Sequence, residues 1–160
     1  MVSVSFSAEK NDFSNQVKSV FVYNFLDFVS WPSVDIKASP TICVLAEDKF
    51  FQILEYIRRE TAQSGQGFVL KKMNNSTHLS ECQIAYIHHS HAKQLDVFFA
   101  NTLNKPILTV SDIRGFVNRG GIVGFIEKGN KIRLEVNNTL ASKNKIKISS
   151  KLLKLAENIK

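Results

Sequence analysis

The sequence has few of the residues that mark unusual classes of protein. Its 160 residues contain two cysteines, three prolines, seven glycines and one tryptophan. These counts exclude disulfide-rich mini-proteins, collagen-like chains and low-complexity segments. No apolar run reaches the roughly 18 residues of a membrane-spanning helix, and no repeat at solenoid spacing is visible.

The remaining composition is that of a globular domain. Hydrophobic residues make up 44% of the chain and charged residues 22%, proportions typical of a folded protein and not of a disordered one. The length predicts one domain with its own core. Twelve phenylalanines predict that this core is rich in aromatic rings.

Positive charge is concentrated near the C-terminal end. Residues 128–160 hold nine basic side chains and two acidic ones, which accounts for the whole net charge of +7. Nucleic acid, anionic lipid or an acidic partner would each attract such a segment. However, no recognised nucleic-acid-binding motif is present, and lysines among leucines are typical of the solvated side of a helix. We therefore expect an exposed basic face and no nucleic-acid partner.

The first predicted helix ends at Trp31-Pro32, because the residue before a proline is pushed out of the α region. Its apolar side chains recur at helical spacing and share one face: Val17, Val20, Phe21, Phe25 and Phe28. Lys18 and Ser19 lie off this face, so the prediction places them away from the core.

Runs of apolar and β-branched residues predict strands at 41–46, 68–70, 82–87, 107–110, 122–127 and 131–136. Helices are predicted between them from residue 48 and from residue 90, and later from Asn137 and from Ser149 or Ser150. Alternating strands and helices indicate a largely parallel sheet. We predict an α/β fold, a single-domain sandwich with a mixed, mostly parallel sheet of about six strands and helices on both faces.

The motifs in these elements, in their order and spacing, resemble one protein family. They are Phe21-Val22-Tyr23-Asn24-Phe25, Trp31-Pro32, Ile42-Cys43-Val44-Leu45, Cys82-Gln83-Ile84-Ala85-Tyr86-Ile87, Leu108-Thr109-Val110-Ser111-Asp112, Gly115-Phe116, Gly120-Gly121, Ile132-Arg133-Leu134-Glu135-Val136-Asn137 and Ile146-Lys147-Ile148-Ser149-Ser150-Lys151-Leu152-Leu153. The chain resembles the YfiR family, also called DUF4154, over about residues 16–157. Residues 1–15 are then an N-terminal remnant or flexible segment, and residues 16–160 are the α/β domain.

The resemblance implies a small periplasmic protein that is not an enzyme and needs no cofactor. It implies binding to the sensor domain of an inner-membrane diguanylate cyclase, or of another signalling protein, which is thereby repressed. Cyclic di-GMP signalling and biofilm formation would fall as a result. Met1–Ser7 contains no apolar segment of a signal peptide. Read literally, this start indicates the cytoplasm, but a periplasmic chain after cleavage begins in the same way.

The cysteines and the histidine-rich segment 88–91 are the residues most suited to a disulfide or a metal site. By their sequence alone, Cys43 and Cys82 fit either a disulfide or two buried thiols, and the resemblance implies the disulfide, in an oxidising compartment. The imidazoles of the segment 88–91 suit zinc, copper or nickel. Neighbouring strand residues face opposite ways, however, and the usual ligand spacings are absent. We interpret these histidines as polar turn residues, with Glu81 and Asp96 as the nearest carboxylates in sequence, and predict no metal site.

The end of the strand at 107–110 is the best candidate for a binding site, because open α/β sheets bind ligands beyond the carboxyl ends of their strands. Two interpretations of the loop that follows stay open. Either its polar residues form an anion-tolerant site, or Asp112 caps the next turn and Gly120-Gly121 permits a tight backbone. The second use is the more common. The candidate contact residues for a partner or a small ligand are Asp112, Arg114, Asn118, Arg119, Arg133 and Glu135. The alternative function is a small-ligand-sensing module that acts on another signalling protein, and in either case the chain could form a homodimer.

Overall fold

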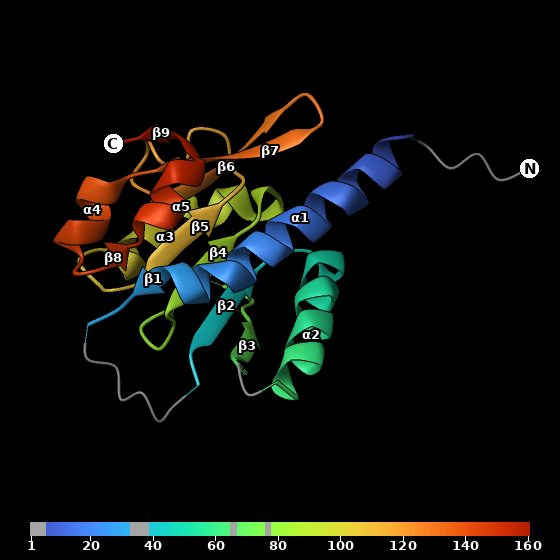
Figure 1. Cartoon of the computed structure of the whole chain (residues 1–160), viewed down its shortest axis with the longest axis horizontal. Helices are drawn as coiled ribbons and strands as arrows, with labels where there is room; N and C mark the ends of the chain where they lie inside the picture. Colours follow the sequence, from blue (N-terminus) through green and yellow to red (C-terminus); the bar gives the residue numbers. More distant parts are fainter. Residues whose placement is uncertain (1–5, 33–38, 65–66, 76–77) are drawn as a thin grey trace, which may run out of the picture.

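A computed structural model describes residues 6–32, 39–64, 67–75 and 78–160 of the chain. At its centre is a seven-stranded sheet with the order β3-β2-β4-β5-β6-β7-β9 (Figure 1). The strands are β2 (Thr41–Leu45), β3 (Val69–Lys72), β4 (Ile84–Ile87), β5 (Leu108–Ser111), β6 (Val123–Lys128), β7 (Lys131–Val136) and β9 (Ala156–Ile159). The β6–β7 hairpin is antiparallel, and all the other neighbours are parallel. The predicted fold is confirmed, with one strand more than expected.

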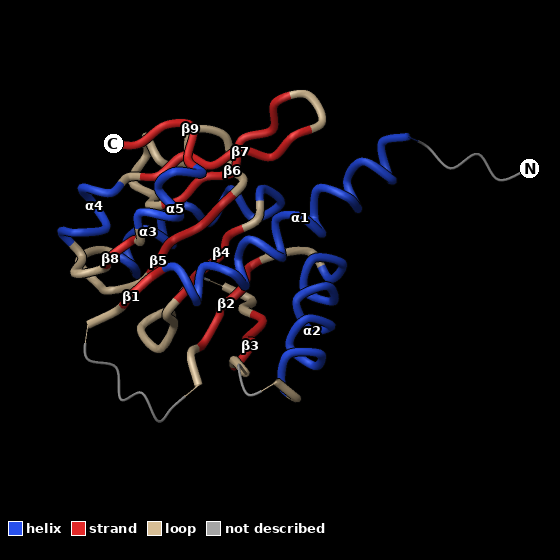
Figure 2. Tube along the Cα trace, in the orientation of Figure 1, coloured by secondary structure: helices blue, strands red, loops and turns tan. Residues whose placement is uncertain are grey.

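Helices cover both faces of the sheet (Figure 2). They are α1 (Phe6–Phe28), α2 (Asp48–Ala62), the 3-10 helix η1 (His89–Gln94), α3 (Leu95–Thr102), α4 (Asn138–Lys143) and α5 (Ser150–Leu155). Successive side chains of a strand point to opposite faces, and β2 follows this rule. Ile42 and Val44 join the core beneath α1 and α2, whereas Cys43 and Leu45 join the core on the α3 side.

Helix α1 differs from its predicted orientation near its middle. Lys18 and Ser19 are buried, while Val20 is 48% exposed. The prediction is therefore wrong for these residues, and the reason is that the buried carboxylate of Asp112 beneath the helix accepts the Lys18 ammonium. In the C-terminal half, Phe25 is buried as expected. The helix also begins at Phe6, so it crosses the boundary expected at residue 15, and the division of the chain at that point stays a prediction.

A separate two-stranded ribbon secures the end of α1. Strand β1 (Val29–Ser30) pairs with β8 (Lys147–Ile148) in antiparallel fashion, and the Ser149 N–H donates to the carbonyl of Phe28 at 2.8 Å. Neither strand was expected from the sequence, because two residues are too short to show a pattern. Strand β9 was also missed, since it directly follows the leucines of α5. Of the helices described, none is both long and apolar enough to cross a membrane.

Cys43 and Cys82 form a disulfide, as the resemblance implied, with their Cα atoms 5.9 Å apart. Cys43 lies in β2 and Cys82 lies just before β4, and both are buried. The bond joins two neighbouring strands on the face that α3 covers. Around it pack Leu79, Ile87 and Phe98, so the covalent link lies inside an apolar layer.

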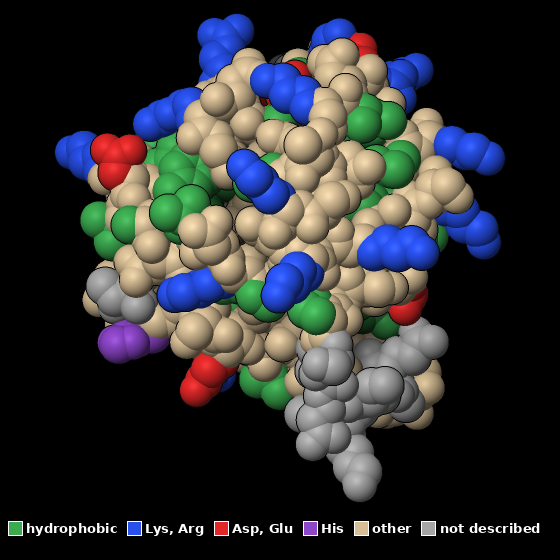
Figure 3. Space-filling model, turned by 90° about the vertical axis from the view of Figure 1, so that its left-hand side faces the viewer, with side chains coloured by type: hydrophobic (Ala, Val, Ile, Leu, Met, Phe, Trp, Pro, Cys, Tyr) green, Lys and Arg blue, Asp and Glu red, His purple; other side chains and the backbone are tan. Residues whose placement is uncertain are grey.

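All nine basic residues of the segment 128–160 are exposed. Figure 3 shows the face that carries α4 and β8, where lysine and arginine side chains are spread widely with few acidic ones among them. Leu152 of α5 is buried while Lys151 and Lys154 beside it are exposed. The segment is thus the solvated side of the C-terminal elements, as the leucine–lysine pattern indicated.

Candidate functional site

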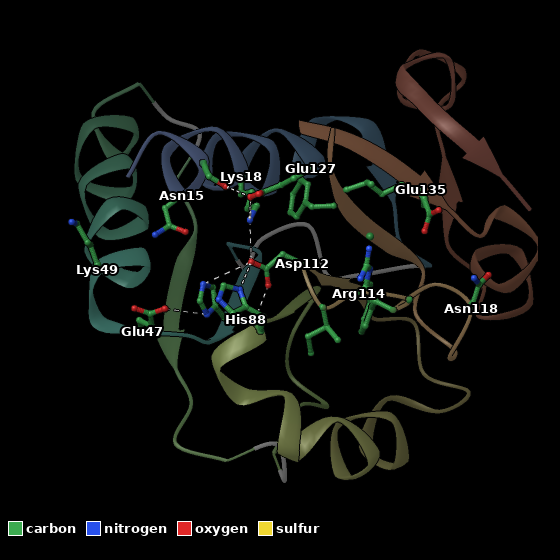
Figure 4. A pocket seen from close by; sticks show the side chains of 18 of the residues that line it. Asn15, Lys18, Glu47, Lys49, His88, Asp112, Arg114, Asn118, Glu127 and Glu135 are labelled. Atoms are coloured by element: carbon green, nitrogen blue, oxygen red, sulfur yellow. Dashed lines mark hydrogen bonds and ion pairs between the residues drawn. The ribbon is translucent and has the colours of Figure 1, made fainter. Parts of the chain in front are cut away.

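A cleft of about 790 Å³ opens at the carboxyl ends of β4 and β5, beneath α1 (Figure 4). Six of its polar side chains form a cluster and come from five elements or their flanking residues. These are Lys18 of α1, Glu47 before α2, His88 and His89 after β4, Asp112 after β5, and Glu127 of β6. The register explains why two of them meet: Ile87 pairs with Ser111, so the next residue on each strand, His88 and Asp112, leaves the sheet at the same edge.

Asp112 is the centre of this cluster. Its side chain is 3% exposed, and its Oδ2 lies 3.0 Å from the Nζ of Lys18, which is 5% exposed. Oδ1 accepts the backbone N–H of His89 at 2.8 Å, and Oδ2 lies 2.8 Å from the ring Nδ1 of the same residue. The carboxylate therefore joins α1 to the segment after β4. A buried charge requires partners of this kind, because desolvation alone would cost several kcal/mol, roughly.

The hydrogen bonds show that Asp112 does not cap the turn after β5. Ser111 performs that role, since its Oγ accepts the N–H of Ile113 at 2.9 Å and donates to the carbonyl of Ile87 at 2.5 Å. The expected capping by Asp112 is thus wrong. The reason is that Lys18 and His89, distant in sequence, offer the carboxylate charged or aligned donors, which form stronger bonds than a turn N–H.

Lys18 also binds a second carboxylate at the cleft. Its Nζ lies 3.1 Å from Oε1 of Glu127, and the hydroxyl of Ser14 donates to the same oxygen at 2.7 Å. Glu127 is 47% exposed at its side chain, so this carboxylate faces the open part of the cleft. One ammonium is thus shared between a buried carboxylate and a partly solvated one.

The charges in the cluster set the protonation states. Burial raises the pKa of Asp112, but the charges of Lys18 and His88 and the hydrogen bond from His89 together lower it further, so the net pKa lies below its ordinary value. Burial lowers the pKa of His88, and the Asp112 charge opposes this only in part. At neutral pH, Asp112 is therefore ionised and His88 is neutral.

Tyr86 lies directly beneath the cluster. Its ring stacks on Phe50 with centroids 4.4 Å apart, and its hydroxyl is buried with no hydrogen-bond partner among the described residues. Burial raises the pKa of Tyr86 well above its ordinary value, and the charge of Asp112 adds to this effect. The hydroxyl is therefore neutral and lies close enough to Asp112 to feel its charge.

The structure brings four of the six expected contact residues to the cleft. Asp112, Arg114, Asn118 and Glu135 line it, whereas Arg119 and Arg133 are exposed outside its lining. The tight backbone expected at Gly120-Gly121 is present. Gly120 has a φ of +126°, and a Cβ on Gly121 would collide with the Phe116 ring.

Three site residues were missed from the sequence: Lys18, Glu47 and Glu127. Lys18 carried one signal, a polar residue between apolar ones near the middle of a long helix. Glu47 is a second carboxylate near the histidines besides Asp112, and its Oε1 lies 3.5 Å from the Nδ1 of His88. The expected Glu81 instead pairs with Lys71. Together with His88 and His89, Glu47 offers donor atoms that could hold a metal ion.

Residues 15–157 of this chain, from α1 to β9, match the family described as DUF4154, YfiR/HmsC-like. The chain belongs to this family. Proteins of the YfiR/HmsC-like family are in general regulatory. No curated protein matches the chain.

Among the solved structures that match this YfiR/HmsC-like chain, two illustrate the shared fold. One is a conserved domain protein from Vibrio cholerae, with a TM-score of 0.61 and 13% identity. The other is an ABC domain in complex with L-Trp from Streptococcus pneumonia, with a TM-score of 0.60 and 9% identity. Each alignment covers 91% of this chain and 60% of the other. The chain thus spans less than two thirds of their length, and at this identity the likeness is one of fold.

Proposed function

We propose that this chain is a non-enzymatic periplasmic regulator. It binds the sensor domain of an inner-membrane diguanylate cyclase, holds the enzyme inactive and so lowers cyclic di-GMP. The observation that carries the proposal is the family match over residues 15–157. To repress its partner the chain must bind the inactive state more tightly than the active one, because equal binding would shift nothing.

The surface that we assign to this contact is the loop after β5 together with the β6–β7 hairpin. Strand β9 holds the two together. Asn158 donates to Oε1 of Glu135 at 3.3 Å, and Lys160 donates to Oδ1 of Asn118. Arg119 and Arg133 are exposed there and lie outside the cleft lining. They are suited to pair with acidic groups of a partner.

The test combines deletion with a charge reversal in the host. Deleting the chain should raise cyclic di-GMP, and the variant Arg119→Glu/Arg133→Glu should fail to restore the low level while keeping its fold by circular dichroism. The variant Lys151→Glu, an equally exposed change on the basic face, should repress normally. Unchanged cyclic di-GMP on deletion would refute the proposal. Full repression by the double variant would refute the assigned surface alone.

A small-ligand sensor is the second candidate, and the cleft favours it. A volume of about 790 Å³ lined by charged and polar groups at the carboxyl ends of β4 and β5 is where α/β sheets hold ligands. The similar ABC domain binds L-Trp, so amino acids are the first compounds to test. Binding should raise the melting temperature, and Arg114→Ala should reduce that shift. No shift with any amino acid or small anion would end this candidate.

A further inference from the structure

We propose that Glu47, His88 and His89 form a binding site for one divalent transition-metal ion at the mouth of the cleft, and that Asp112 orients the site. The proposal is independent of the partner and of any small ligand. One donor atom from each of the three residues lies within 4.8 Å of the others. Two imidazoles and a carboxylate, with a further position open to water, are a ligand set that zinc, nickel and copper accept.

His88 and His89 are adjacent in sequence, but both side chains line the cleft. His88 is the last extended residue after β4, and η1 begins at His89, so the alternation of a strand stops between them. Their ring centroids are 4.0 Å apart. The objection that neighbouring strand residues face opposite ways therefore does not apply here.

His89 has the arrangement of a prepared metal ligand. Its Nδ1 lies 2.8 Å from Oδ2 of Asp112, and because that carboxylate is ionised, Nδ1 must carry the proton. The free lone pair is then on Nε2 of a ring that is 62% exposed. A carboxylate that holds one ring nitrogen and thereby presents the other is the usual outer contact of a metal-binding histidine.

His88 and Glu47 can accept a cation between them, although Nδ1 of His88 also lies 2.8 Å from the hydroxyl of Ser90. Nδ1 of His88 accepts the N–H of Ser90 at 3.1 Å, so in the neutral ring it carries a lone pair and no proton. This nitrogen lies 3.5 Å from Oε1 of Glu47 (Figure 4). Two electron-rich atoms thus face each other, and a metal ion would turn this contact into an attraction.

The same geometry limits the affinity. In tetrahedral zinc sites, ligand atoms lie about 3.3 Å apart, so the group must contract. Glu47 can move, since its side chain is 53% exposed. A metal on Nδ1 of His88 would also take the lone pair that Ser90 uses. We therefore expect moderate affinity, with copper bound more tightly than zinc.

The test uses the untagged, disulfide-intact chain after treatment with a chelator. Titration with Zn²⁺ in a calorimeter should show one saturable site per chain, while Mg²⁺ should show none. The variants His89→Gln and Glu47→Gln change exposed side chains and should each weaken Zn²⁺ binding at least about 10-fold. The variant His78→Gln, an exposed histidine outside the cluster, should bind Zn²⁺ as the parent does.

A third variant tests the orienting role. Asp112→Asn should weaken Zn²⁺ binding about 10- to 100-fold, and circular dichroism must show that the chain is folded. Absence of a saturable Zn²⁺ site in the parent chain would overturn the proposal. Equal affinity in His89→Gln, Glu47→Gln and the parent would overturn it too.

Discussion

The strands β2, β4 and β5 are held at two places, and the chemistry of the two differs. On the α3 side, the Cys43–Cys82 disulfide links β2 to the start of β4 within an apolar layer. At the carboxyl ends, beneath α1, the buried pair Lys18–Asp112 joins the helix to the sheet. The first link depends on an oxidising environment and is indifferent to pH. The second depends on pH and is not affected by thiol reductants. Redox conditions and pH therefore act on separate parts of the fold.

Breaking the charged link should have the largest effect. Lys18→Met leaves the Asp112 carboxylate buried without its ammonium and should lower the free energy of unfolding by about 3–5 kcal/mol. Lys18→Met/Asp112→Leu should recover much of that loss, because no unpaired charge then remains. Lys49→Met, which breaks an exposed pair with Asp12, should change stability by less than about 1 kcal/mol. Urea unfolding measures the free energy of unfolding of all three variants. An equal loss in Lys18→Met and in Lys18→Met/Asp112→Leu would contradict this account.

Removing the covalent link should have the next largest effect. The disulfide spans 39 residues, and Cys43→Ala/Cys82→Ala should lower the free energy of unfolding by about 2–4 kcal/mol. The parent chain should lose a similar amount in reductant, whereas the variant should be insensitive to it. If the variant also shifted the pH dependence of unfolding, the two regions would not be independent.

The pH dependence of the charged region should come from His88. Its pKa in the folded chain lies below the ordinary value of 6.5, so the unfolded chain takes up this proton first as the pH falls. The contribution of His88 to the free energy of unfolding is therefore complete above pH 6.5. Below that pH it declines by up to about 1.4 kcal/mol per pH unit. In chelator, His88→Asn should flatten this slope and His91→Gln should not. A parent chain with no slope from pH 7 to 5 would contradict the prediction.

The smallest change concerns Tyr86, which is fully buried. Tyr86→Phe removes a buried hydroxyl that has no described partner and should leave the free energy of unfolding equal or raise it by about 1 kcal/mol. Thermal unfolding is a sufficient measurement. A loss greater than about 1 kcal/mol would show that the hydroxyl has a partner after all, such as a bound water.

The sheet was predictable because its buried strands are short apolar runs. The segments at 41–46 and 107–110 coincide closely with β2 and β5. What the runs could not supply is the order β2-β4-β5, since it depends on which strands pack together in three dimensions. That order brings Glu47, His88 and Asp112 to one edge, and no spacing along the chain reveals it.

Lys18 shows that local sequence patterns also fail to reveal long-range contacts of a helix. Hydrophobic periodicity assumes that charged side chains lie in water, and a lysine that pairs with a carboxylate 94 residues away breaks the assumption. Phe25 followed the rule, whereas Lys18 and Val20 did not. Local patterns thus predicted the core, whereas the cleft required contacts between distant segments.

The β1–β8 ribbon has a consequence for the timing of folding. Val29 pairs with Ile148, so the end of α1 is secured by residues near the opposite end of the chain. Contacts so far apart in sequence form slowly, because the loop between them must close first. A chain that emerges from its N-terminus would leave β1 without its pairing strand until residue 148 is released, long after Lys18 and Asp112 are both available.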